Sequence, residues 1–409
     1  MEPRVLDVVR ADHRGGVERD PEEHHLRARA RHAAGRSVGA EAQGEGLVDF
    51  DFSADQYGLR DEARRFLEKQ CPVSHVREFL DDKAGWSRDL WKQMADLGWM
   101  ALPFPEQYGG LGQSFLDLVL LLGELGRSLA PVPFLSSVAM AGQVILAHGS
   151  EEQRARLLPG IASGDRIAAL AVSEQPQGFG GTSIDMHPTQ DGDTWHLNGE
   201  KKYVLDAPAA DLFVVAACVG DQNRWFVVEE GARVTPQTTY DPTRGAGSVS
   251  FDDAVADPLE APFLFPGLQL ATAAVCAEMI GAAEKILDMT VEYSKQREQF
   301  GRPIGSFQAI KHKCAEMATE LEAARAAAYY ACWAVASGAE DAALSSHIAK
   351  SYCSDQLAHL AGEGVQGHGG IAFTWEHDMH LYLKRIKTAQ VFLGDGPYHR
   401  ERIARIVGL

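Results

Sequence analysis

The sequence predicts an α+β fold with a helical unit at each end and a small antiparallel β unit between them. Residues 48–165 place apolar side chains at helical spacing. Residues 166–262 form short alternating or β-branched runs separated by Gly, Asn and Asp, as strands and turns do. Residues 263–409 return to long helical stretches whose apolar faces need neighbours, so a bundle is expected. We therefore expect three domains with these bounds.

Residues 1–47 differ from the rest of the chain. They contain no aromatic residue and no Lys, but eight Arg and many Ala, Gly and Glu. Such a segment cannot bury enough apolar area to offset its chain entropy, and it has no apolar core of a secretory signal. We expect a disordered extension, or sequence upstream of the true start of translation, and leave it out of the predicted fold.

The charge balance limits the partners. Lys and Arg number 39 and Asp and Glu number 57, which gives a formal net charge of −18. A balance this acidic argues against a nucleic-acid surface and against adhesion to anionic lipid. The longest apolar run, about residues 326–336, is shorter than the ~18 residues that cross a bilayer. The six cysteines show no metal-ligand or C-x-x-C spacing, so we expect reduced thiols in a cytoplasmic protein without a metal site.

Caps and turn residues locate the first elements. Ser53 and Ser150 are each expected to cap a helix that starts at the next residue, and Gly98 to end a helix that precedes it. Residues 114–130 are so apolar that we expect a buried helix there. In the β unit, Asn198-Gly199 predicts the two-residue turn of a hairpin.

Common catalytic motifs are missing from the sequence. It contains no H-E-x-x-H, no G-x-S-x-G, no phosphate-binding G-x-x-x-x-G-K and no G-x-G-x-x-G after a strand. The G-H-G-G at 367–370 is by itself typical of a helix end followed by a turn.

The segment YSKQREQFGRPIGSFQAIKHKCAEM at 293–317 resembles the acyl-CoA dehydrogenases, as do segments at 97–112, 171–181, 197–217 and 365–387. The resemblance covers about residues 50–409. These flavoproteins of lipid degradation oxidise acyl-CoA thioesters to 2,3-enoyl-CoA. The resemblance implies a middle β-barrel or sandwich, a C-terminal four-helix bundle, non-covalent FAD, an electron-transfer flavoprotein as acceptor, and a homo- or hetero-oligomer that builds the flavin site at a subunit interface.

The resemblance also implies a set of flavin contacts. Arg297 offers a planar fork for the FAD pyrophosphate across a subunit boundary, although an ion pair with Glu298 or Asp288 would also explain it. Glycine is needed where a cofactor presses on the main chain, as in the Q-x-x-G-G segment. Each of four further contacts has a structural alternative: Ser173 as the end of a strand, Tyr203 as a core residue of a strand, and Phe300 and Phe307 as core residues. The complete expected set is Ser173, Tyr203, Arg297, Phe300, Phe307, Gln308, Gln366, Gly369 and Gly370.

The catalytic base is where the sequence departs from the family pattern. The reaction needs a carboxylate that takes the α-proton of the thioester. The two positions at which family members carry it correspond here to Leu393 and Ala271. Glu278 lies two helical turns after Ala271, roughly 10 Å along the same face, and is the first replacement candidate. The alternative for Glu278 is a buried ion pair with Arg or Lys of a neighbouring helix, and Asp395 is a second candidate.

The C-terminal segment G-D-G-P-Y-H-R-E-R resembles actinobacterial-type members, some of which act on steroid-side-chain CoA esters as one half of a heteromeric enzyme. His399 and Arg400 would then line the cofactor or CoA, or else form a surface cation cluster at a helix C-terminus. Three functions follow: a self-sufficient dehydrogenase for a bulky acyl-CoA, a non-catalytic flavin-site partner of a homologous chain, or a flavin monooxygenase on the same fold.

Overall fold

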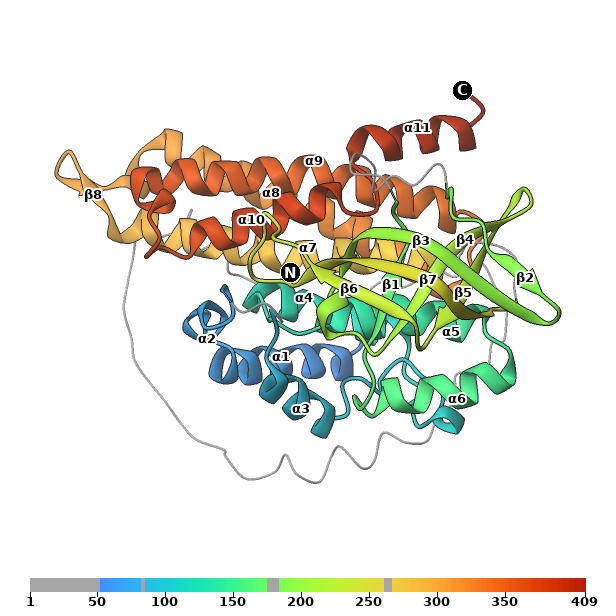
Figure 1. Cartoon of the computed structure of the whole chain (residues 1–409). Coiled ribbons are helices and arrows are strands. Elements are labelled where there is room, and N and C mark those ends of the chain that lie inside the picture. The colour runs from blue at the N-terminus through green and yellow to red at the C-terminus, as the bar shows by residue number, and fades with distance from the viewer. Residues whose placement is uncertain (1–51, 82–84, 175–183, 261–266) are drawn as a thin grey trace. The chain divides into compact units, whose positions relative to one another are not determined.

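Helices begin and end the part of the chain that the structure describes, and strands lie between them (Figure 1). The structure is a computed structural model that describes residues 52–81, 85–174, 184–260 and 267–409. The expectation for residues 1–47 lies outside the described residues. The division into three domains stays a prediction, because Phe52–Leu409 forms one compact unit.

Six helices form the N-terminal part within the described residues, and both predicted caps are confirmed. The backbone N–H of Gln56 donates to Ser53 Oγ at 3.2 Å, and the Ser53 N–H donates back to Gln56 Oε1 at 2.9 Å. Ser150 likewise accepts from the Gln153 N–H at 3.2 Å. The helices are α1 Ala54–Gln70, α2 Val73–Arg77, α3 Arg88–Asp96, α4 Phe115–Ser128, α5 Gly142–His148 and α6 Glu151–Ala162, with a π-helical stretch, η3 Leu135–Ala141, before α5.

The predicted β unit is confirmed, with two differences in its pairing. The strands are β1 Ala168–Ala171, β2 Thr189–Asp191, β3 Thr194–Leu205, β4 Leu212–Val219, β5 Gln222–Val228, β6 Ala232–Pro236 and β7 Ala246–Pro258. Their order is β1-β4-β5-β7-β3-β2, with β6 also paired to β7. The β1–β4 pair is parallel, so the expectation of a purely antiparallel sheet is wrong there. Pairings among the described strands do not close into a barrel.

The hairpin predicted at Asn198-Gly199 is also wrong. Strand β3 continues through both residues, and its register with β7 shifts between Leu197 and Gly199. Gly199 has φ +127°, and the Asn198 side chain accepts from the Asp253 N–H at 2.8 Å. The same turn-forming residues therefore make a β-bulge inside a strand. The β2–β3 turn instead lies at Gly192, with φ +58°.

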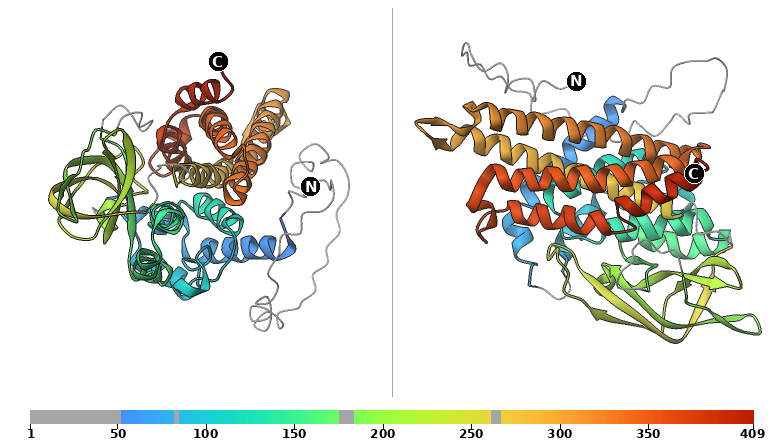
Figure 2. Two further views of the ribbon diagram at one scale, coloured as in Figure 1. Left: turned by 90° about the vertical axis from the view of Figure 1, so that its right-hand side faces the viewer. Right: turned by 90° about the horizontal axis from the view of Figure 1, so that it is seen from above.

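The four-helix bundle is confirmed. Its helices are α7 Gly267–Gln296, α8 Gln308–Ser337, α9 Ala342–His368 and α10 Met379–Val391, and a further helix, α11 Gly396–Ile406, packs on α9. Figure 2 shows the long helices side by side, with the sheet apart from the α7–α8 connection. That connection is a short hairpin of β8 Glu298–Gln299 and β9 Arg302–Pro303. None of the helices within the described ranges is long and apolar enough to cross a membrane.

Candidate flavin and acyl-CoA site

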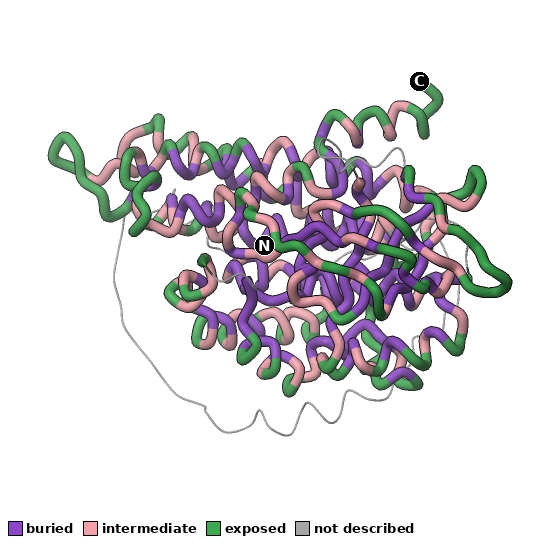
Figure 3. Tube along the Cα trace, in the orientation of Figure 1, coloured by how far each residue is buried: buried purple, intermediate pink, exposed green. Residues whose placement is uncertain are grey.

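The β8–β9 hairpin presents the first group of predicted site residues. It projects beyond the ends of α7 and α8 and is exposed except at Pro303, which is half-buried (Figures 1 and 3). Phe300 at its tip has φ +56° and is 92% exposed. The Phe300 ring meets the edge of Phe307 at 6.1 Å, and the Arg302 guanidinium lies 4.1 Å from the Phe307 ring centre. An exposed aromatic ring close to a cation suits a planar ligand or a partner surface.

Arg297 lies at the base of this hairpin with an exposed side chain. The alternative ion pairs of the sequence analysis are not formed: within the described residues, Asp288 binds Arg127 at 2.7 Å and Glu298 has no bond to Arg297. The Arg297 guanidinium is therefore available to an anion such as a pyrophosphate. Gln308, the first residue of α8, is exposed at the same end.

The Q-x-x-G-G segment reaches this same end of the bundle. His368, the last residue of α9, stacks on Tyr293 of α7 with ring centres 4.6 Å apart. Gly369 then turns the chain with φ +68°, and no heavy atom of the other described residues, apart from the chain neighbours, lies within 4 Å of a Cβ position at Gly369 or Gly370. Gln366 is exposed beside them. Among the described residues, a cation without an ion pair, the exposed Phe300 and open glycine backbone fit a dinucleotide such as FAD.

Ser173 and Tyr203 form a second group, in the β unit. The Lys202 N–H donates to the Ser173 carbonyl at 2.7 Å, which ties the end of β1 to β3. Tyr203 is half-buried with φ +53° at a shift in the β3–β7 register. A residue that the sequence analysis missed holds this junction: the buried Lys201 pairs with Glu174 and donates to the Val172 carbonyl at 3.1 Å. The strands lie apart from the β8–β9 hairpin in both views (Figures 1 and 2).

The two usual base positions are apolar and buried. Ala271 lies on α7 with no exposed surface, and Leu393, after the end of α10, is 8% exposed. Asp395 is occupied as a helix cap, because its Oδ1 accepts from the Tyr398 N–H at 2.9 Å. None of these three side chains is a free carboxylate beside α7.

Glu278 lies in a buried ion network. Its Oε2 accepts from Arg244 at 2.9 Å, its Oε1 binds both Arg244 and Arg385, and Arg385 donates to Asp241 at 2.6 Å. Burial raises the pKa of Glu278, but the charges of Arg244 and Arg385 outweigh it, so the pKa lies below its usual value. A carboxylate held in this way is a weak proton acceptor. The basic partner on another helix that the sequence suggests is Arg385 of α10. No sign in the sequence points to the second partner, Arg244, which lies in the loop before β7.

His399 and Arg400 lie in the first turn of α11, so they do not form a helix C-terminal cluster. His399 is buried, and its Nε2 lies 3.1 Å from the Leu393 carbonyl oxygen. Arg400 is half-exposed and pairs with Asp355. Both residues therefore contact α9, and His399 also supports the turn after α10.

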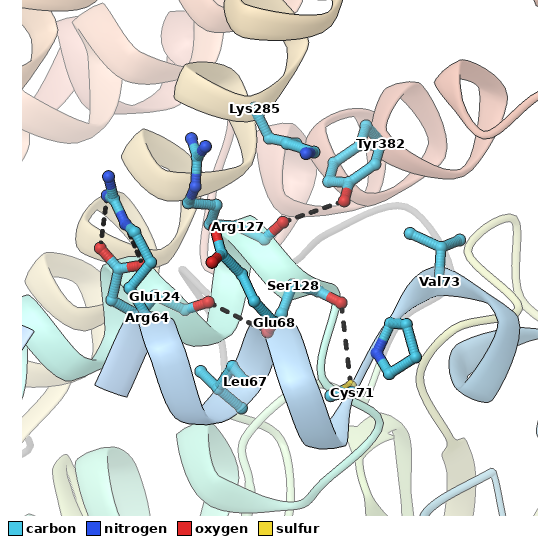
Figure 4. Close-up of a pocket in the computed structure, with 11 residues that line it drawn as sticks. Arg64, Leu67, Glu68, Cys71, Val73, Glu124, Arg127, Ser128, Lys285 and Tyr382 are labelled. Carbon is cyan, nitrogen blue, oxygen red and sulfur yellow. Dashed lines mark hydrogen bonds and ion pairs between the residues drawn. The ribbon is translucent and has the colours of Figure 1, made fainter. Parts of the chain in front are cut away.

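A polar cavity of about 160 Å³ lies among α1, α4, α7 and α10 (Figure 4). Several of its lining groups bind one another: Arg64 donates to Glu124 at 2.7 Å, and the Tyr382 hydroxyl donates to the Arg127 carbonyl at 2.9 Å. Its lining, as far as the structure describes it, includes none of the predicted site residues.

Comparisons with known proteins show the family to which the chain belongs. Family models named acyl-CoA dehydrogenase, N-terminal domain and C-terminal domain, match residues 53–165 and 266–408. The chain is 36% identical over 329 residues to the acyl-CoA dehydrogenase IpdE2 of Mycobacterium tuberculosis, which covers 80% of this chain and 89% of that one.

Solved structures are similar over most of the described chain. The ChsE4-ChsE5 complex of Mycobacterium tuberculosis matches with a TM-score of 0.82 and 28% identity, over 88% of this chain and 98% of that one. A variant of the Tcur3481-Tcur3483 steroid ACAD matches with a TM-score of 0.82 and 29% identity, over 86% and 97%. The chain belongs to the acyl-CoA dehydrogenase family, whose members are FAD-dependent oxidoreductases acting on acyl-CoA.

Proposed function

We propose that this chain oxidises acyl-CoA to the 2,3-enoyl-CoA as one half of a flavin site shared with a homologous chain that supplies the base. One observation carries the proposal. Leu393 and Ala271 are apolar at the two usual base positions, and the Glu278 carboxylate is held by two arginines. By contrast, Arg297 is exposed and the backbone at Gly369 is open, which supports flavin binding by this chain.

The hydride acceptor, the cofactor contacts and the proton acceptor can then each be assigned. Bound FAD supplies the acceptor for the β-hydride. In this chain Arg297 would hold the pyrophosphate, Gly369 and Gly370 would give the cofactor close access to the backbone, and Ser173 and Tyr203 would contact the ring system. The α-proton would pass to a carboxylate of the homologous chain.

The separation of the two groups of residues supports an oligomer. A hairpin that projects from one end of the bundle can reach the β unit of a second chain more readily than that of its own (Figures 1 and 2). The exposed Phe300 is the kind of apolar side chain that an interface buries. An electron-transfer flavoprotein would then reoxidise the flavin in this assembly.

The substrate that we propose is a bulky acyl-CoA of the steroid-side-chain type. Its support is similarity to a steroid enzyme and to a two-component complex. The relative IpdE2, an acyl-CoA dehydrogenase by name, is 36% identical to this chain and supports an acyl-CoA as the substrate.

Anaerobic titration tests the proposal. The chain is purified alone and together with a homologous chain that carries Glu at the position of Leu393, and each sample receives a steroid-side-chain acyl-CoA or butyryl-CoA. We expect the flavin absorption of the pair to bleach with the bulky substrate, and that of the chain alone to stay unchanged. Full bleaching by the chain alone would overturn the shared site, and preference for butyryl-CoA would overturn the substrate class.

A further inference from the structure

The turn between α10 and α11 has an unusual backbone. Leu393 has φ +58° and Gly394 has φ +106°, so two successive residues lie in the left-handed region. Glycine adopts this region freely, but a leucine does so at a cost. Strain of this kind persists where the surroundings fix it and collects at functional positions. The side chains around this turn therefore show what holds its backbone in this conformation.

Lys350 of α9 is the main support. Its side chain has no exposed surface, and its Nζ donates to the Gln390 carbonyl at 3.0 Å, to the Gly394 carbonyl at 2.7 Å and to Ser354 Oγ at 2.9 Å. The Ser354 hydroxyl itself donates to the Gln390 carbonyl at 3.0 Å. Three acceptors thus match the three N–H donors of a protonated lysine.

A histidine pair binds the Leu393 carbonyl of the turn. His399 Nε2 lies 3.1 Å from the Leu393 oxygen, which can only accept, so Nε2 carries the proton. His399 Nδ1 then accepts from His347 Nδ1 at 2.8 Å. Burial and the nearby Lys350 charge lower the pKa of His399 to about 3, which keeps the ring neutral. The carbonyls of residues 390, 393 and 394 are therefore all bound by buried side chains.

We propose that Lys350 is a positioning residue: with His399 it fixes the turn so that the side chain at position 393 points in one direction, toward the acyl group. The inference rests on the proposed function for the location of the acyl group, but not for the turn itself. In this chain the side chain at position 393 is leucine, so the turn keeps the backbone geometry that would orient a catalytic base although the base itself is absent. A carboxylate placed at position 393 would be oriented by the same turn.

The charge state of Lys350 should make the stability of the turn depend on pH. The groups that face it are Cys276 of α7, Cys353 and Asp355 of α9, and Asp395 and His399 of α11 and its cap. Burial lowers the pKa of Lys350 to about 8, and these neighbours do not restore it. Above that pH the amine has two N–H donors for three acceptors. The turn should then loosen over a narrow pH range.

Hydrogen exchange of residues 388–397 measures the turn without any cofactor. The Phe392 and Gly394 amides are protected by bonds of 3.2 Å to the carbonyls of Thr388 and Val391. We expect Lys350→Met to speed their exchange at least tenfold, whereas the control Lys387→Met should leave it unchanged. Lys387 is suitable because it lies on the same stretch of α10, and its Nζ donates to the Gln390 side chain at 3.3 Å rather than to a carbonyl of the turn.

Wild-type protein gives an independent test in case Lys350→Met does not fold. Between pH 7 and 9 its exchange in this segment should rise more steeply than base catalysis alone requires, and more steeply than in α8. Unchanged exchange in a folded Lys350→Met variant would overturn the proposal. A wild-type profile that follows base catalysis alone would overturn it as well.

An activity measurement links the turn to the reaction. We expect FAD-loaded Leu393→Glu protein to bleach with acyl-CoA without a partner, and Leu393→Glu/Lys350→Met to do so at least tenfold more slowly at equal FAD occupancy. Equal rates in the two variants would overturn the positioning role. If Leu393→Glu never bleaches although the exchange results hold, the proposed place of the acyl group fails and the role of Lys350 in the turn stands.

Discussion

Arg297 carries its charge at the exposed end of the bundle without an ion pair among the described residues. If it holds the FAD pyrophosphate, Arg297→Ala should weaken FAD binding by roughly 1–3 kcal/mol, because a charge-assisted hydrogen bond is lost. Titration of the apoprotein with FAD measures the change. Arg65→Ala is the matched control, since Arg65 is an exposed arginine of α1. Equal FAD affinity in the Arg297 variant and the control would remove Arg297 from the site.

Substitution of Glu278 distinguishes a flavin site shared with a second chain from a self-sufficient enzyme. Glu278→Gln keeps the shape of the side chain but removes the charge that Arg244 and Arg385 bind. We expect a loss of roughly 1–3 kcal/mol in the free energy of unfolding, because buried guanidinium groups lose their counter-charge. Flavin bleaching by the assembled pair should stay within a few-fold of wild type. A drop of several orders of magnitude with unchanged stability would make Glu278 the base instead.

At the scale of elements, Asp206 joins the end of β3 to η3 in the interior. It is fully buried with φ +54°, and its Oδ2 accepts from the Ser136 hydroxyl at 2.7 Å. Burial raises the pKa of Asp206 to about 6, although Arg244 and Ser136 act against this. A pKa raised by folding adds stability below the unfolded value, near pH 4, and that stability is lost as the pH rises through about 6.

The effect of Asp206→Asn on the free energy of unfolding should therefore depend on pH. Asparagine tolerates a positive φ and can still accept from Ser136, but it does not titrate. We expect the variant to be more stable than wild type above pH 7, by up to roughly 2–3 kcal/mol, and to converge with it near pH 4. Urea unfolding of both proteins from pH 4 to 8 measures the difference. A constant difference across that range would contradict a raised pKa.

The elements that could be predicted are those that depend on near neighbours in the chain. Ser53 and Ser150 cap their helices through a residue three positions away. Asn198-Gly199 was misread because the same residues serve a turn or a bulge, and only pairing with β7 decides between them. The parallel β1–β4 pair and the Arg244–Glu278 contact join segments far apart in sequence, which no local pattern encodes.

At the scale of the whole molecule, the β8–β9 hairpin is expected to reach a second chain. Phe300 is 92% exposed, so Phe300→Asp should change the stability of an isolated chain by no more than ~0.5 kcal/mol. Burying a phenylalanine in an interface is worth roughly 1.5–3 kcal/mol, so the same change should weaken association tenfold or more. Sedimentation across a concentration series measures the assembly, and FAD content is measured on the same samples.

Val255→Asp is the control for this change, because Val255 is an apolar residue of β7 that is 60% exposed but lies away from the hairpin. We expect it to leave both assembly and FAD content as in wild type. If Phe300→Asp assembles normally yet loses FAD, the ring contacts the cofactor and not the second chain's surface. If it keeps both, the hairpin takes no part in the shared site, and the flavin contacts must be completed from within one chain.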